Sequence, residues 1–298
     1  MSFRDRFQNL KETVGQWTDS TGGGSLDRKI ERNLAEMEGG TEIERTAAVK
    51  ALVIQAQTDD KWADPIITSF LRVLPGQLAS PQEAIIDGLL ELRKVKVSRE
   101  EEIFESIQET LDSPYPSVRS KVVDIWTRFS LKSDAKTSDT IAVLFEMLSD
   151  DDKDVRYQTQ ESLSKILHTV PKVALPELKN AIGDDDWRVT YHSIVLLTEF
   201  AKKYPNPSVA LAPEVIEAFN SGERLKERAA DCIGMLGLAN PEAVKPAVPG
   251  LIKGLESKSS ELRKACATAL GRIGSKNGMV VYHAVPRLAR ALKNDDWY

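Results

Sequence analysis

A spacing of about 37 residues recurs along this chain, and it limits the possible folds more than any other feature. Large apolar residues follow one another at steps of 37, 37, 37, 34, 37, 36 and 37 residues. They are Met37, Leu74, Leu111, Leu148, Ile182, Phe219, Leu255 and Leu292. In the second half, a proline precedes each of these positions by six residues, at Pro176, Pro213, Pro249 and Pro286. Repeats of this length are typical of solenoids, in which each unit packs only against its neighbours.

Each repeat is predicted to contain two helices. The segment Ser138 to Ser149 carries apolar residues at helical spacing and is expected to be a first helix. A short turn rich in Asp, Ser, Pro or Gly follows, and its polar side chains can cap the next helix. The second helix then begins with an apolar residue seven positions after the repeated one, at Val118, Val155, Val189 and Leu262. Because no stretch of useful length alternates with a period of two, the pattern predicts an all-α protein.

The repeats resemble the HEAT repeat, in which a helix carries Pro, then Asp eight residues later, then Arg fourteen residues later. The matching positions are Pro176 with Asp184, Asp150 with Arg156, and the Arg positions Arg119 and Arg263. Thr190 stands in place of Arg in the fifth unit, and the first two units lack both Pro and Asp. The resemblance covers residues 26–298 and implies a right-handed α-solenoid of about seven and a half repeats. It also implies an Asp–Arg ladder between successive turns and a first helix bent at Pro.

Residues 1–17 form a separate element ahead of the repeats. Their apolar residues recur at steps of three and four, as on one side of an amphipathic helix: Phe3, Phe7, Leu10, Val14 and Trp17. Residues 18–25 follow as a glycine-rich flexible linker. Three roles are open for this helix: a cap on the first repeat, a segment that binds a partner or a second copy, and a contact with a membrane surface.

The other end stops inside a repeat. Residues 294–298 repeat the pattern of residues 184–188, where a second helix is expected to start. The eighth unit is therefore half a repeat, and its first helix is expected to act as the cap. Truncation of a longer protein explains the same ending.

The amino-acid composition of the chain excludes or disfavours several classes of function. The 298 residues carry a net charge of −5, which disfavours a dedicated nucleic-acid binder, and no apolar run approaches the roughly 18 residues that span a bilayer. The two cysteines, Cys232 and Cys266, form no framework and are expected to be buried thiols in a cytoplasmic protein. The three histidines lie far apart, so neither a metal nor a cofactor is expected. His168 and His192 are interpreted as polar surface groups on second helices.

The second helices offer the best candidate surface for a partner. Beside their apolar stripe runs a mixed basic and aromatic row: Lys121, Arg128, Tyr157, Lys165, Tyr191, His192, Arg228, Lys264 and Arg272. Tyrosine and arginine are enriched where interfaces carry their binding energy, although a solvated helix face has a similar composition. Acidic turns such as Asp150–Asp152 and Asp184–Asp186 could bind a basic partner or a divalent cation, and helix capping explains them equally well.

These observations favour a non-enzymatic scaffold or adaptor that binds a protein or peptide on its concave face or through the amino-terminal helix. One alternative is a HEAT-like enzyme similar to bilin lyases or to alkylpurine DNA glycosylases. In the second case Tyr157, Glu161 and Tyr191 would face the DNA. Another alternative is a coat-like adaptor of membrane trafficking, in which residues 2–17 make a peripheral membrane contact.

Overall fold

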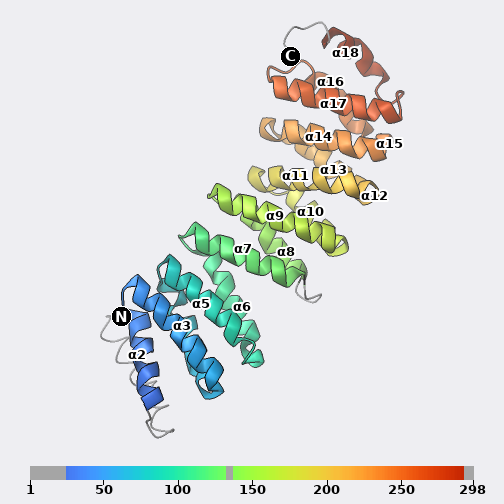
Figure 1. Cartoon of the computed structure of the whole chain (residues 1–298). Coiled ribbons are helices and arrows are strands. Elements are labelled where there is room, and N and C mark those ends of the chain that lie inside the picture. Colours follow the sequence, from blue (N-terminus) through green and yellow to red (C-terminus); the bar gives the residue numbers. More distant parts are fainter. Residues whose placement is uncertain (1–24, 132–136, 292–298) are drawn as a thin grey trace. The chain divides into compact units, whose positions relative to one another are not determined.

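The computed structural model describes residues 25–131 and 137–291, and within these ranges every regular element is a helix (Figure 1). They divide between two compact units, Met1–Val122 and Val123–Tyr298, which are described separately. No helix in the described ranges is both long and apolar enough to cross a membrane. The predicted amino-terminal helix and nearly all of the predicted linker lie outside the described residues, and the first helix begins at Ser25.

The first unit consists of paired helices joined by short turns. Its elements are α2 (Ser25–Gly39), α3 (Glu42–Thr58), η1 (Asp60–Trp62), α4 (Ala63–Val73), η2 (Leu74–Gly76), α5 (Ala79–Leu92), η3 (Val97–Arg99), α6 (Glu100–Glu109), η4 (Thr110–Asp112) and the start of α7 (Pro116–Ser130). Within this unit α2 packs on α3, and α3 packs on α5, the second helix of the next pair. Thr41 caps α3 through a reciprocal pair of hydrogen bonds with Glu44, which holds the pKa of that glutamate below its ordinary value.

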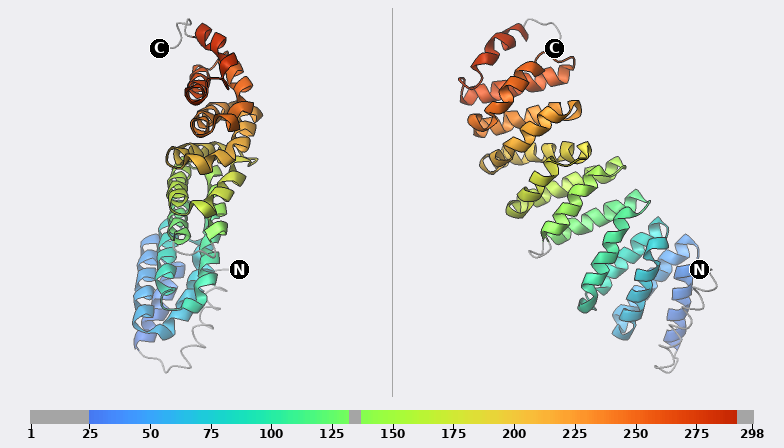
Figure 2. Two further views of the ribbon diagram at one scale, coloured as in Figure 1. Left: turned by 90° about the vertical axis from the view of Figure 1, so that its right-hand side faces the viewer. Right: turned by 180° about the vertical axis from the view of Figure 1, so that it is seen from behind.

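The second unit continues the same pairing. Its elements after α7 are α8 (Thr137–Glu146), η5 (Met147–Ser149), α9 (Lys153–Thr169), α10 (Pro171–Ile182), α11 (Trp187–Lys203), α12 (Pro205–Ser208), η6 (Val209–Leu211), α13 (Ala212–Ser221), α14 (Glu223–Ala239), α15 (Pro241–Val244), η7 (Lys245–Ala247), α16 (Val248–Gly254), α17 (Ser260–Lys276), η8 (Tyr282–Ala284) and α18 (Val285–Ala291). The second helices α9, α11, α14 and α17 pack side by side in one layer, and the first helices form the other layer (Figure 2). The helix pairs confirm the predicted α-solenoid.

The repeated apolar positions form the core of the pairs, as predicted. Their side chains are buried at Met37, Leu74, Leu148, Ile182, Phe219 and Leu255, and so are Val118, Val155, Val189 and Leu262 at the starts of second helices. Leu111 is only half-buried, whereas its neighbour Thr110 is buried. Leu292 lies outside the described residues.

The first helices of the later repeats carry a proline, and two of these helices are broken just before it. Pro176 lies inside α10, which remains one helix. In the next two repeats a 3-10 turn separates two short helices, and Pro213 or Pro249 stands in the first turn of the second one. A proline has no amide hydrogen and its ring clashes with the preceding turn, so it is accommodated best at the start of a helix. The bend that the resemblance implied is therefore a break in these two repeats.

One hydrogen bond closes the turn inside each of four repeats. The side chain of Arg119 donates to the carbonyl oxygen of the residue six positions earlier, and Arg156 and Arg263 do the same, at 2.6, 2.5 and 3.0 Å. Thr190, which replaces Arg in the fifth unit, makes the equivalent bond to Asp184 at 3.0 Å. A link between successive turns comes from a different arginine, Arg188, which pairs with Asp151 of the preceding repeat at 3.0 Å.

Candidate functional site

The predicted basic and aromatic row is divided between the two units. In the first unit, Lys121 on α7 forms an ion pair with Asp87 on α5 at 2.7 Å. In the second unit, Arg128 is exposed and pairs with Asp124 one turn earlier on its own helix, at 2.6 Å. Both cations are thus matched by a neighbouring carboxylate. The remaining members of the row lie on α9, α11, α14 and α17.

Several of these members stand apart from one another. Tyr157 is 65% exposed on α9, and Lys165 and Lys264 are exposed on α9 and α17. Arg272 is half-buried and its guanidinium reaches the carbonyl oxygen of Asp231 on α14 at 3.5 Å. These side chains lie on the predicted helices, but the structure does not gather them into one cluster.

Tyr191 and Arg228 contact each other, and two further residues form a second contact of the same kind beside them. The Nε of Arg228 on α14 donates to the hydroxyl of Tyr191 on α11 at 3.0 Å, and its guanidinium lies 5.7 Å from the centre of that ring. One turn earlier on each helix, Arg224 lies 4.8 Å from the centre of the Trp187 ring, which is 43% exposed. We call Trp187, Tyr191, Arg224 and Arg228 the aromatic–arginine cluster.

Each pair in the cluster is held by a direct electrostatic contact. The ring quadrupole makes the potential over an aromatic face negative, and this attracts an arginine by about 0.5–1 kcal/mol at exposed sites. The hydrogen bond that Arg228 donates to Tyr191 also raises the pKa of Arg228. The two rings meet edge to face with centres 6.5 Å apart. The four side chains therefore form an aromatic and cationic surface across two repeats, and the carboxylate of Glu227 lies 4.0 Å from the guanidinium of Arg228.

Sequence reasoning missed Trp187 and Arg224, although their spacing carried the signal. Trp187 precedes Tyr191 by four residues, and Arg224 precedes Arg228 by four. Residues four apart lie on the same face of a helix, so each missed residue is the neighbour of one that was found.

The two histidines on second helices are more buried than expected. His192 is half-buried, and its Nδ1 lies 2.6 Å from the amide oxygen of Gln160 on α9. Burial, with a smaller contribution from the charge of Arg156, lowers the pKa of His192. His168 packs against the rings of Phe200 and Tyr204, with centres 5.8 Å away in each case. Both lie on second helices, as expected, and both are half-buried rather than fully exposed, because each contacts the neighbouring second helix.

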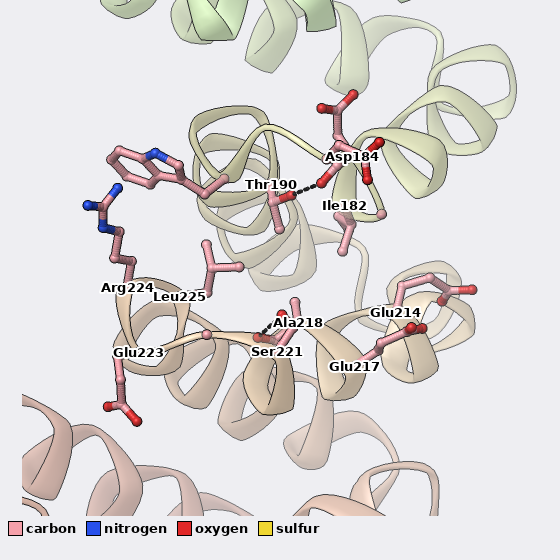
Figure 3. A pocket seen from close by; sticks show the side chains of 14 residues that line it. Ile182, Asp184, Thr190, Glu214, Glu217, Ala218, Ser221, Glu223, Arg224 and Leu225 are labelled. Carbon is pink, nitrogen blue, oxygen red and sulfur yellow. Dashed lines mark hydrogen bonds between the residues drawn. The ribbon is translucent and has the colours of Figure 1, made fainter.

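A pocket of about 610 Å³ lies beside the cluster, between two successive turns of the second unit (Figure 3). The turn between α10 and α11 forms one wall, and α13 with the start of α14 forms the other. Its lining residues are Ile182, Gly183, Asp184, Asp185, Trp187, Thr190, Glu214, Glu217, Ala218, Ser221, Gly222, Glu223, Arg224 and Leu225. Trp187 and Arg224 thus belong to both the pocket and the cluster.

The charges that line the pocket are mostly negative. The lining residues include five carboxylates, from two aspartates and three glutamates, and one guanidinium. Glu214 and Glu217 lie toward one end of the pocket and Arg224 toward the other (Figure 3). At the wall between α10 and α11, the side chain of Asp184 accepts from the backbone of Asp186 at 2.7 Å, which fixes the turn.

The remaining predictions concern residues outside this region. Cys232 and Cys266 are free and buried, as expected, and burial raises the pKa of each thiol to about 12. The described ranges contain no group of three His, Cys, Asp or Glu residues that could hold a metal ion. Phe3, Phe7, Leu10, Val14 and Trp17 lie outside the described residues.

Comparison with known proteins identifies the repeats. Residues 104–198 match the family model described as HEAT repeats, and residues 223–273 match the one described as HEAT-like repeat. A search of curated proteins gave no match.

Among solved structures, the chain is similar in fold to Kap121p bound to RanGTP, with 15% identity, a TM-score of 0.64, and coverage of 99% of this chain and 36% of that one. It is also similar to Kap121p alone, with 15% identity, a TM-score of 0.60, and coverage of 97% and 34%. For Kap95p, yeast importin-β, in a structure with RanGDP, the identity is 16%, the TM-score 0.55, and the coverage 91% and 38%. The chain spans about a third of the length of these proteins. Both family models and the paired helices agree that this chain is a HEAT-repeat protein.

Proposed function

We propose that this chain is a protein-binding scaffold and that it holds a partner protein or peptide across α11 and α14 through the aromatic–arginine cluster. The observation that carries the proposal is the placement of two arginines over two aromatic rings on neighbouring second helices. Trp, Tyr and Arg are the residues that most often carry the binding energy of protein interfaces.

The geometry of the cluster favours binding because its side chains are already ordered. A flexible side chain that becomes fixed on binding costs about 0.5–1.5 kcal/mol. Here the hydrogen bond between Arg228 and Tyr191 and the contact between Arg224 and Trp187 hold both arginines before a partner arrives. Proteins of similar fold bind other proteins, as the complex of Kap121p with RanGTP illustrates.

The proposal is tested by affinity capture from native lysate with three versions of the full chain. The wild type is compared with Tyr191→Ala/Arg228→Ala, which removes one ring and one cation from the cluster. The control is Tyr282→Ala/Lys253→Ala, which removes one tyrosine ring and one cation from exposed positions on η8 and α16. Circular dichroism melting of each version establishes that it is folded before capture.

We expect at least one protein to be retained by the wild type and the control and to be depleted at least tenfold by the cluster variant. Equal retention by all three versions would place the binding surface elsewhere. Recovery of nucleic acid or of a coloured ligand, with no protein, would overturn the scaffold proposal in favour of an enzyme.

A further inference from the structure

We infer that the pocket between the turns of the fifth and sixth repeats binds a basic segment of a partner, with a lysine or arginine side chain inserted toward Glu214 and Glu217. The inference rests on the proposed function and names the chemical class of the partner. It is carried by the pocket, by the excess of carboxylates that line it, and by the positions of those carboxylates.

The size of the pocket suits a few inserted side chains. Its volume of about 610 Å³ lies in the range of sites that enclose small ligands. The wall residues Ile182, Ala218 and Leu225 supply apolar surface in the middle of the pocket (Figure 3). The methylene chain of a lysine can lie along such a surface while its charged end reaches polar groups.

The excess negative charge around the pocket favours binding of a positively charged side chain. Glu214 pairs with Lys179 at 3.1 Å, and Glu223 pairs with Lys226 on the next turn of α14. Within the described ranges, the carboxylates of Asp185 and Glu217 form no ion pair. Even with Lys179 and Lys226 counted beside Arg224, five carboxylates stand against three cations around the pocket, so a further positive charge from a partner is attracted.

Glu214 and Glu217 are the carboxylates best placed to receive it. They are three residues apart on α13, so both project from the same side of this helix. One oxygen of Glu214 is bound by Lys179, and the other is buried and accepts no hydrogen bond from a described residue. The negative charge at this end is therefore only partly compensated. Arg224 lies toward the other end, beside Trp187, so it does not neutralise Glu214 and Glu217, and Glu217 is the exposed member of this acidic pair.

The test measures binding of a fluorescein-labelled octalysine peptide to the full chain by fluorescence anisotropy. The variant Glu214→Gln/Glu217→Gln removes two charges and keeps the shapes of the side chains. The matched control Glu161→Gln/Glu199→Gln removes two charges from exposed positions on α9 and α11, outside the pocket. A labelled octaglutamate peptide tests the sign of the charge, and Glu217→Lys serves as a second pocket variant at an exposed position.

We expect octalysine to bind, octaglutamate not to bind, and the pocket variants to weaken octalysine binding about tenfold or more while the control weakens it less than twofold. Equal weakening by the pocket and control variants would show unspecific attraction to the net charge and would overturn the inference. So would the absence of octalysine binding to the wild type. This assay does not use the cellular partner, so its failure would leave the cluster proposal in place, and failure of the capture experiment would leave this result unchanged.

Discussion

A Cβ atom built on Gly254, the last residue of α16, would lie 2.3 Å from the Sγ of Cys266 on α17. That distance is far below a normal contact, so α16 and α17 approach each other only because residue 254 has no side chain. We predict that Gly254→Ala lowers the free energy of unfolding by about 1–3 kcal/mol, because the added methyl group overpacks the core. Urea denaturation followed by circular dichroism measures the change.

Gly271 provides the control for this prediction. It lies in the interior of α17, and a Cβ atom there would meet nothing within 4 Å. Gly271→Ala is expected to raise the free energy of unfolding by about 0.5–1 kcal/mol, because alanine is the better helix former. Substitutions that shift stability in the same direction at both positions would contradict the explanation by close contact.

The side chain of Asp152 caps α9, whereas Gly222 at the start of α14 provides no side-chain cap. Substitutions at these two positions are therefore expected to change the stability in opposite directions. The carboxylate of Asp152 accepts from the backbone of Asp154 at 2.8 Å and of Val155 at 3.2 Å, so Asp152→Ala is expected to cost about 0.5–2 kcal/mol. Gly222 at the start of α14 is extended, with φ −165°, and has open space around it. Gly222→Ser is expected to stabilise by a few tenths to about 1 kcal/mol. Thermal melting of both variants checks the opposite signs.

The helix pairs were predictable because their signal is repeated. An apolar position that returns seven times cannot be mistaken for local variation, and helices of this kind depend mainly on a buried stripe. The helix breaks before Pro213 and Pro249 were harder to predict from the sequence, since Pro176 occupies the same position in an unbroken helix.

The two thiols yield a prediction about reactivity and pH. Because burial raises the pKa of Cys232 and Cys266 to about 12, both remain protonated at pH 8 and are expected not to react with Ellman's reagent in the folded chain. Both should react in urea, and an exposed Lys264→Cys variant should gain one thiol that reacts at once. In the unfolded chain these thiols ionise near their ordinary pKa of 9.0, so their contribution to stability is present below that pH and is lost as the pH rises toward 12. Fast reaction of either native cysteine would contradict its burial.

The contribution of His192 to stability depends on pH in the opposite direction. Burial lowers its pKa below the ordinary 6.5, so the unfolded chain takes up a proton at this site before the folded chain does. Its contribution to stability is therefore present above pH 6.5 and is lost as the pH falls through the lowered value. We expect the NMR titration of its ring to have a midpoint below 6.5, and His192→Gln to lose less stability than the wild type between pH 7 and 5. A midpoint at or above 6.5 would contradict this prediction.

The candidate site was only partly predictable, for a physical reason. Tyr191 and Arg228 were found because a position beside an apolar stripe follows from helical spacing alone. That Arg224 lies over Trp187 depends on how α14 is offset along α11, and no spacing within one helix determines that offset. The pocket was harder still to predict from the sequence, because its walls come from two repeats and packing between these repeats sets the distance between the walls.

The bonds that close the turns have a consequence for how such a chain can change its length. Arg119, Arg156, Thr190 and Arg263 each bind a carbonyl oxygen of their own repeat. A duplicated or deleted repeat would therefore carry its turn geometry with it and leave the turns of its neighbours intact. The number of repeats, and with it the length of the protein, can thus change in evolution or by engineering without new contacts to close each turn.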